Sequence, residues 1–186
     1  MEYQGRLYFM PRKQIKERTE ELLEFCDLLR FRKRTVRKLS GGMKRKLMVC
    51  RALLTDPEIL LLDEPTAGMD ALSRRQMWNL LRKLNEKNLT ILLTTHYMEE
   101  AQNLCNRVAL MDHGKLEEVS TPQALIESLG AYAVDEMTAD GTQNHYFHTR
   151  QDAIRYLEGL TGQASLRETT LEDVFVERAG KHLNTK

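Results

Sequence analysis

The chain has 186 residues, 41% of them hydrophobic and 30% charged, with a formal net charge of +1. This length and composition indicate a globular protein made of one ordinary domain with a small appendage. The near-zero net charge excludes a chain whose overall field attracts nucleic acid or acidic lipid, and no apolar run is long enough to cross a bilayer as a helix.

The first half of the chain alternates helical patterns with aliphatic runs. Apolar residues at helical spacing predict one helix over Arg12–Arg30 and a second over Ser40–Leu54. The segments Glu58–Asp63 and Leu89–Thr94, separated by a helix that Asp70 can cap, are continuous aliphatic runs. Such runs are typical of strands covered on both faces. The order of elements predicts an α/β fold with a parallel sheet flanked by helices.

The second half begins with a helix after His96 and a third strand at Arg107–Met111. A tight turn leads into Leu116–Val119, and a short helix follows over Thr121–Leu129. After Gly130 the pattern changes to short mixed segments, which predict a small α+β tail. Its expected strands and helices are 131–137, 145–150, 151–160, 165–168 and 170–179. We therefore expect two domains, residues 1–130 and residues 131–186.

The cysteines and a basic run carry no chemistry of their own. Cys26, Cys50 and Cys105 are far apart and lie in apolar helical patterns, which predicts buried free thiols and argues against zinc or a disulfide framework. The basic residues between 30 and 38 have few aromatic neighbours, so we interpret them as a solvated loop and expect no nucleic-acid partner. His145 and His148 are assigned to a strand face, because no cysteine or carboxylate partner for a metal lies nearby.

A glycine-rich turn, Ser40-Gly41-Gly42, opens the second helix. Two glycines allow the backbone to approach a bulky anion, and the free amides at the start of a helix attract negative charge. The Ser40 hydroxyl can cap the helix or donate to a phosphate oxygen. Taken alone, the turn is equally consistent with an ordinary helix cap. The acidic strand that follows makes a phosphate contact the better interpretation.

Two adjacent carboxylates, Asp63 and Glu64, close the first aliphatic strand. The carboxyl end of a parallel strand is where α/β folds bind ligands. Asp63 is placed to hold Mg²⁺ through water, because magnesium keeps much of its hydration. Glu64 would act as general base on a water facing the terminal phosphate, a role worth about 10²–10⁴ in rate. The alternative, a surface acidic pair, explains poorly the four aliphatic residues before Asp63.

His96 follows the second aliphatic strand directly. A lone histidine is more often structural, but the ends of neighbouring parallel strands meet at one edge of a sheet. His96 is therefore expected to lie near Glu64, where it would orient the water and the carboxylate or donate to the γ-phosphate. The sequence thus predicts a site for a magnesium-bound nucleoside triphosphate.

These motifs and their order resemble ATP-binding cassette (ABC) proteins. Leu39–Leu47 resembles the signature motif, Ile59–Glu64 the Walker B strand, Ala67–Asp70 the D-loop and Thr95-His96 the switch histidine. The resemblance covers nearly the whole chain, and four ordered motifs make it highly specific.

Further segments look most like the ATPase subunits of type-2 exporters, the drug-export and polysaccharide-export group. They are Met43–Lys46, Thr66–Asp70 and Thr94–Ala101, and the segment Thr170–Phe175 is similar to the C-terminal end of the drug-export subunits. The resemblance implies a P-loop NTPase-like fold and an ATPase that powers export.

In that family two ATPase domains pair head to tail, and each ATP lies between one subunit's phosphate loop and the other's signature turn. The resemblance therefore implies that Ser40, Gly41 and Gly42 contact the partner's nucleotide, whereas Asp63, Glu64 and His96 serve their own. Asp70 would lie at the dimer seam. Implied partners are a second ATPase domain and an integral-membrane permease, which would hold the chain at the cytoplasmic face of the membrane.

The sequence departs from the family in one respect: it contains no Gly-x-x-x-x-Gly-Lys-Ser/Thr phosphate loop. The family's glutamine loop also precedes the signature region, and Tyr3-Gln4-Gly5 does not resemble it. We therefore expect the isolated chain to hydrolyse ATP poorly. Two alternatives stay open: a non-catalytic module that lends its signature motif to a partner ATPase, and an ABC protein of translation or DNA repair. The latter usually carries two cassettes or long coiled coils.

Overall fold

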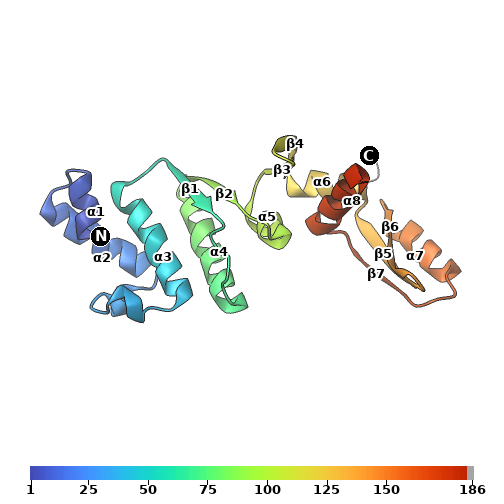
Figure 1. The fold of residues 1–186 in the computed structure, drawn as a ribbon, viewed down its shortest axis with the longest axis horizontal. Coiled ribbons are helices and arrows are strands. Elements are labelled where there is room, and N and C mark those ends of the chain that lie inside the picture. Colours follow the sequence, from blue (N-terminus) through green and yellow to red (C-terminus); the bar gives the residue numbers. More distant parts are fainter. Residues whose placement is uncertain (184–186) are drawn as a thin grey trace. The chain divides into compact units, whose positions relative to one another are not determined.

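The computed structural model describes residues 1–183, which fall into two units (Figure 1). The first unit ends at His96 and the second begins at Tyr97. The expected division into domains 1–130 and 131–186 stays a prediction. None of the helices in the described part is both long enough and apolar enough to span a bilayer.

The first unit contains two parallel strands and the helices that precede, join and pack beside them. Its elements are α1 (Glu2–Leu7), α2 (Arg12–Phe25), the 3₁₀ turns η1 (Leu29–Phe31), η2 (Val36–Lys38) and η3 (Leu53–Thr55), α3 (Gly41–Ala52), β1 (Ile59–Asp63), α4 (Ala71–Glu86) and β2 (Thr90–Thr94).

The helices of the first unit confirm the helices predicted from the sequence, with one correction to a boundary. The helix predicted over Arg12–Arg30 ends at Phe25. Asp27 adopts a left-handed backbone, with φ of 58°, which an α-helix cannot continue through. The two cap predictions hold: the Ser40 hydroxyl accepts from the Met43 amide at 3.3 Å, and Asp70 accepts from the Ser73 amide at 2.9 Å.

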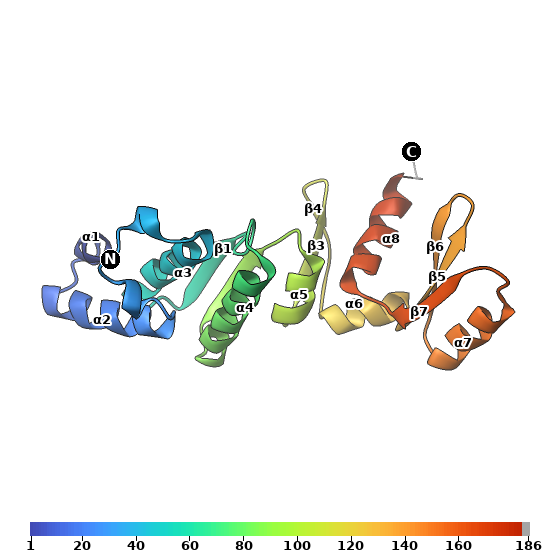
Figure 2. The ribbon, with the colours of Figure 1, turned by 90° about the horizontal axis from the view of Figure 1, so that it is seen from below.

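Strands β1 and β2 pair in parallel, with Asp63 opposite Thr94. Figures 1 and 2 show α4, which connects them, running alongside the pair. The expectation that both strands are covered on both faces is wrong. Leu60 is buried, but Leu61 and Leu92, which face the other way, are 70% and 64% exposed. Within residues 1–183 the pair therefore has one covered and one open face.

The second unit combines a hairpin, an antiparallel sheet and four helices. Its elements are α5 (Met98–Leu104), β3 (Val108–Asp112), β4 (Lys115–Ser120), α6 (Pro122–Leu129), β5 (Tyr132–Thr138), β6 (Gly141–Phe147), α7 (Arg150–Gly159), β7 (Ala164–Glu168) and α8 (Leu171–Leu183).

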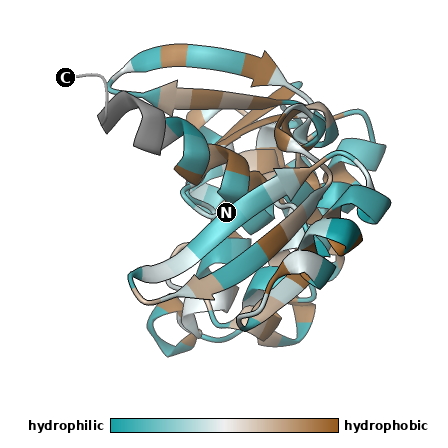
Figure 3. Cartoon of the chain, turned by 90° about the vertical axis from the view of Figure 1, so that its right-hand side faces the viewer, coloured by the Kyte–Doolittle hydropathy of each residue, from teal (hydrophilic) through white to brown (hydrophobic). Residues whose placement is uncertain are grey.

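The pairing of these strands corrects one expectation and confirms another. The third strand, β3, exists, but among the described residues it pairs only with β4, in an antiparallel hairpin. It does not extend the parallel β1–β2 pair. The α+β character of the tail is confirmed, since β5 lies between β6 and β7 in an antiparallel sheet. Hydrophobic and hydrophilic residues are mixed along these strands (Figure 3), as expected of sheets with one covered face.

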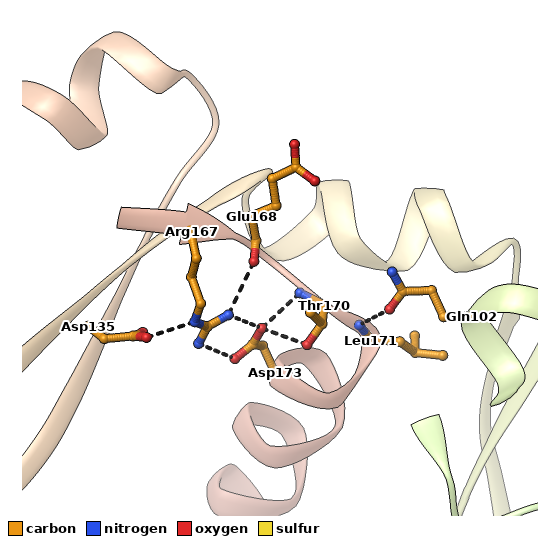
Figure 4. A network of polar contacts seen from close by, with 7 residues as sticks. All are labelled: Gln102, Asp135, Arg167, Glu168, Thr170, Leu171 and Asp173. Atoms are coloured by element: carbon orange, nitrogen blue, oxygen red, sulfur yellow. Dashed lines mark hydrogen bonds and ion pairs between the residues drawn. The ribbon is translucent and has the colours of Figure 1, made fainter. Parts of the chain in front are cut away.

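Helix α8 packs into the same core as the residues before position 130. That core consists of Ala101, Val108, Leu110, Leu125, Ile126, Leu171 and Val174. The N-terminus of α8 is also tied by polar contacts, because the Gln102 side chain accepts a hydrogen bond from the Leu171 amide at 2.9 Å (Figure 4).

A charged network joins α8 to the antiparallel sheet (Figure 4). Arg167 on β7 donates to Asp135 on β5 at 2.7 Å and, through two nitrogens, to Asp173 on α8 at 2.7 and 2.8 Å. Thr170 also donates to Asp173 from its amide and its hydroxyl. The hydrogen bonds that Arg167 donates to the Asp173 carboxylate are the main cause that raises the pKa of Arg167. The two bonds from the Arg167 guanidinium to the two oxygens of the Asp173 carboxylate are bidentate, and this fixes the relative orientation of the two side chains.

The tail histidine also has local partners. His145 Nε2 lies 3.0 Å from Glu136 and 3.1 Å from the Tyr156 hydroxyl. The described residues contain no group of three or more histidine, cysteine or acidic side chains that could hold a metal ion. The three cysteines are free thiols, with Cys26 and Cys50 buried and Cys105 partly buried.

Candidate functional site

The carboxylates and the histidine predicted from the sequence lie together at the ends of β1 and β2. Asp63 is the last residue of β1 and Glu64 follows it, whereas His96 lies two residues beyond the end of β2. The His96 Nδ1 atom is 2.9 Å from Glu64 Oε1. Both side chains are partly open to solvent, with 59% and 43% of their surface exposed. A solvent-borne substrate can therefore reach the pair.

The backbone of Glu64 is held in an uncommon conformation. Its φ of 43° lies in the left-handed region, which non-glycine residues rarely adopt. Its amide donates to the Thr94 carbonyl at 3.0 Å, which extends the pairing of β1 and β2 by one residue. The chain therefore turns sharply at Glu64, immediately after the strand. Left-handed residues of this kind are frequent at functional sites.

Asp63 lies on the open face of the strand pair, opposite Thr94. The Thr94 hydroxyl donates to Asp63 Oδ1. A hydrated Mg²⁺ that is shared with a nucleotide phosphate requires only one protein carboxylate, whereas a metal site made of protein ligands alone needs several. Asp63 therefore fits a water-bridged magnesium ligand and does not fit a dedicated protein metal site.

The glycine turn has room for a ligand at one residue and is crowded at the other. A side chain at Gly41 would meet nothing within 4 Å, whereas a Cβ at Gly42 would approach the Ser73 hydroxyl to 3.0 Å. An open cavity of about 810 Å³ adjoins this turn, and its lining includes Ser40, Gly42, Lys46 and Ser73.

Asp70 is joined to the glycine turn through Ser73. The Ser73 hydroxyl donates to Asp70 at 2.6 Å, and this bond is the main cause that lowers the pKa of Asp70. The structure thus places the predicted residues in two groups. One is Asp63, Glu64 and His96 at the strand ends, and the other is the glycine turn with Asp70.

Sequence reasoning missed two residues of the site, Thr94 and Arg45. Thr94 forms hydrogen bonds with both carboxylate residues. This contact could have been predicted from the sequence, because Thr94 is the last residue of its strand and pairs with Asp63. Arg45 on α3 donates to the carbonyls of Glu64 and Pro65. Arg45 belongs to the segment Met43–Lys46, whose basic residues were noted in the sequence, but nothing in that pattern indicates where its side chain points.

The comparisons with known proteins agree with this arrangement. The family model described as ABC transporter matches residues 3–67. The Nod factor export ATP-binding protein I of Cupriavidus metallidurans is 38% identical over 200 residues, covering 96% of this chain and 66% of that protein. The linearmycin resistance ATP-binding protein LnrL of Bacillus subtilis is 30% identical over 188 residues, covering 97% and 60%.

Solved structures show the same fold. One is the ADP conformation of an ATP-binding cassette of an ABC transporter, with a TM-score of 0.60 and 25% identity over 64% of this chain and 47% of that one. Another is cbiO1 from Clostridium perfringens, part of the ABC transporter complex cbiONQ. Its TM-score is 0.59, with 26% identity over 62% and 47% of the two chains.

The chain spans about two thirds or less of the length of the curated relatives it matches. The chain belongs to the family of ABC transporter ATPases.

Proposed function

We propose that the chain is the ATP-binding and ATP-hydrolysing subunit of a type-2 ABC exporter, or a fragment of that subunit. The observation that carries this proposal is the contact between Glu64 and His96, 2.9 Å apart at the ends of adjacent parallel strands and next to Asp63. A carboxylate oriented by an imidazole beside a second carboxylate suits activation of water at a metal-bound phosphate. The two relatives, a Nod factor export protein and a linearmycin resistance protein, support an export role.

In this proposal each residue has one task. Glu64 takes a proton from the attacking water, and His96 orients the carboxylate and the terminal phosphate. Asp63 would hold a hydrated Mg²⁺, and the metal would supply charge neutralisation of the phosphates. The amides of α3 behind Ser40, Gly41 and Gly42 receive the phosphates of a nucleotide bound mainly by a second ATPase domain.

The proposed transporter contains two further components. A second ATPase domain pairs head to tail, with Asp70 at the seam, where its bond to Ser73 keeps it next to the glycine turn. A separate membrane permease carries the transported molecule. On this proposal the chain works at the cytoplasmic face of the membrane, bound to the permease.

The test is turnover of ATP by membranes that carry the whole transport system. Glu64→Gln should lower kcat by about 10²–10⁴ and keep ATP binding, because only the proton acceptor is lost. His96→Ala should lower kcat while Glu64 is intact. The matched control is Glu86→Gln, an exposed carboxylate at the end of α4, which should leave kcat unchanged. Full turnover in Glu64→Gln membranes would refute the proposal.

A further inference from the structure

Arg45 connects the glycine turn to the catalytic strand end. It lies on α3, five residues after Ser40, and its side chain crosses to the turn that follows β1. One terminal nitrogen donates to the Glu64 carbonyl at 2.7 Å and Nε donates to the Pro65 carbonyl at 3.2 Å. Hydrogen bonds from a permanently charged guanidinium are stronger than neutral ones. Arg45 thus fixes two successive peptide groups at the point where the chain leaves the strand.

These peptide groups include the left-handed residue. A non-glycine residue with φ of 43° persists only where its surroundings hold it there. On one side of Glu64, its amide bonds to the carbonyl of Thr94 at 3.0 Å and lies 3.3 Å from the Thr94 hydroxyl. On the other side, its carbonyl is held by Arg45. The direction of the Glu64 side chain, and hence its contact with His96, depends on both.

We infer that Arg45 is a positioning residue for Glu64 and links the placement of α3 to the alignment of the carboxylate. This inference rests on the proposed function, in which Glu64 is the general base. When the Ser40–Gly42 turn engages a nucleotide, any movement of α3 carries the Arg45 guanidinium with it. Glu64 then reaches its working orientation only while α3 is in place. Engagement of one nucleotide is thereby coupled to hydrolysis of the other.

The first arm of the test observes the site directly in the 186-residue chain. The probe is the pair of ¹⁵N chemical shifts of the His96 ring, which respond to its contact with the Glu64 carboxylate. Glu64→Gln defines the shift when the carboxylate is lost. Arg45→Met removes both hydrogen bonds at similar side-chain length and should move the resonances in the same direction. Arg45→Lys, which keeps one donor and the charge, should lie between Arg45→Met and the parent.

The control is Arg51→Gln, which removes an exposed positive charge from the same helix and should leave the His96 resonances unmoved. Unchanged His96 resonances in Arg45→Met overturn the inference. Should Arg45→Met fail to fold, Arg45→Lys decides: resonances identical to the parent overturn the inference, and intermediate ones support it.

The second arm measures steady-state ATP hydrolysis by the whole transport system. Arg45→Met should lower kcat by about 10- to 100-fold, with KM for ATP changed less than about twofold, because the base is misaligned while binding is kept. If Glu64→Gln retains full kcat, the proposed function fails. If Glu64→Gln abolishes turnover but Arg45→Met matches Arg51→Gln, only the role of Arg45 fails.

Discussion

At the scale of single residues, Asp173 shows how a buried carboxylate is kept ionised. Burial raises its pKa, but the hydrogen bonds from Arg167 and Thr170 outweigh burial, so its pKa lies below the ordinary value of 3.8. A carboxylate with a depressed folded pKa stabilises the fold fully above its unfolded pKa. That stabilisation is lost as the pH falls through the folded pKa. The contact between α8 and β7 should therefore weaken in acid.

We predict that Asp173→Asn lowers the free energy of opening α8 by about 2 kcal/mol at pH 7, because the negative charge facing Arg167 and one of its two acceptor oxygens are lost. The difference from the parent should shrink as the pH falls below about 3.8. Amide hydrogen exchange of α8 measures this opening. Glu172→Gln, at the exposed neighbouring position, is the control and should show no such pH dependence. A difference that stays constant down to pH 2 would contradict the role of the ionised carboxylate.

At the scale of elements, the open face of β1 and β2 is an apolar surface. Leu61 and Leu92 occupy facing positions in the register and are mostly exposed. Exposed apolar strand surfaces promote association between chains. We predict that the 186-residue chain self-associates through this face, and that Leu61→Thr with Leu92→Thr reduces the association, as measured by sedimentation at two concentrations.

The same double substitution should cost little stability, within about 0.5 kcal/mol for each exposed position. Leu60→Thr is the matched control on the covered face, where Leu60 is 4% exposed. It should destabilise the first unit by about 2–4 kcal/mol, because it opens a cavity and buries a hydroxyl. If Leu61→Thr with Leu92→Thr associates as strongly as the parent, the open face is not the contact surface.

The elements also show what the sequence could and could not predict. Helix and strand positions followed from periodicity and caps, because these signals are local. The parallel pairing of β1 with β2 was predicted, but the antiparallel partner of β3 was not, because pairing depends on tertiary context. The hairpin of β3 and β4 had a local signal, since His113 and Gly114, both with positive φ, form the tight turn that brings the strands back antiparallel.

The candidate site divides in the same way. Glu64 and His96 were predicted to meet because parallel strands end at one edge. The contact of Arg45 with the Glu64 carbonyl joins residues 19 positions apart through a side chain that leaves a helix. No periodic pattern encodes that direction, so only the folded chain shows it.

At the scale of the whole molecule, the 186 residues supply a signature-like turn and an acidic strand end but no phosphate-loop motif. Phosphoryl transfer depends almost wholly on positioning and charge stabilisation of the phosphates. We therefore predict that the purified 186-residue chain hydrolyses ATP no faster than its own Glu64→Gln variant. A coupled assay for released phosphate measures this, and turnover well above the variant contradicts it.

The same chain should still contribute to the binding of a nucleotide that another subunit holds. In the proposed head-to-tail arrangement the Ser40–Gly42 turn would face phosphates bound by the partner's phosphate loop. The chain should therefore bind ATP only in the presence of an ABC ATPase that carries this loop. Fluorescent ATP binding, with and without a complete subunit whose own base is disabled, tests this. Ser40→Arg should abolish the gain, because a bulky side chain blocks the approach of the phosphates, whereas Glu64→Gln should preserve it. A gain that Ser40→Arg leaves intact would place the shared contact elsewhere. A gain in binding without turnover would instead identify the chain as the non-catalytic module considered from its sequence.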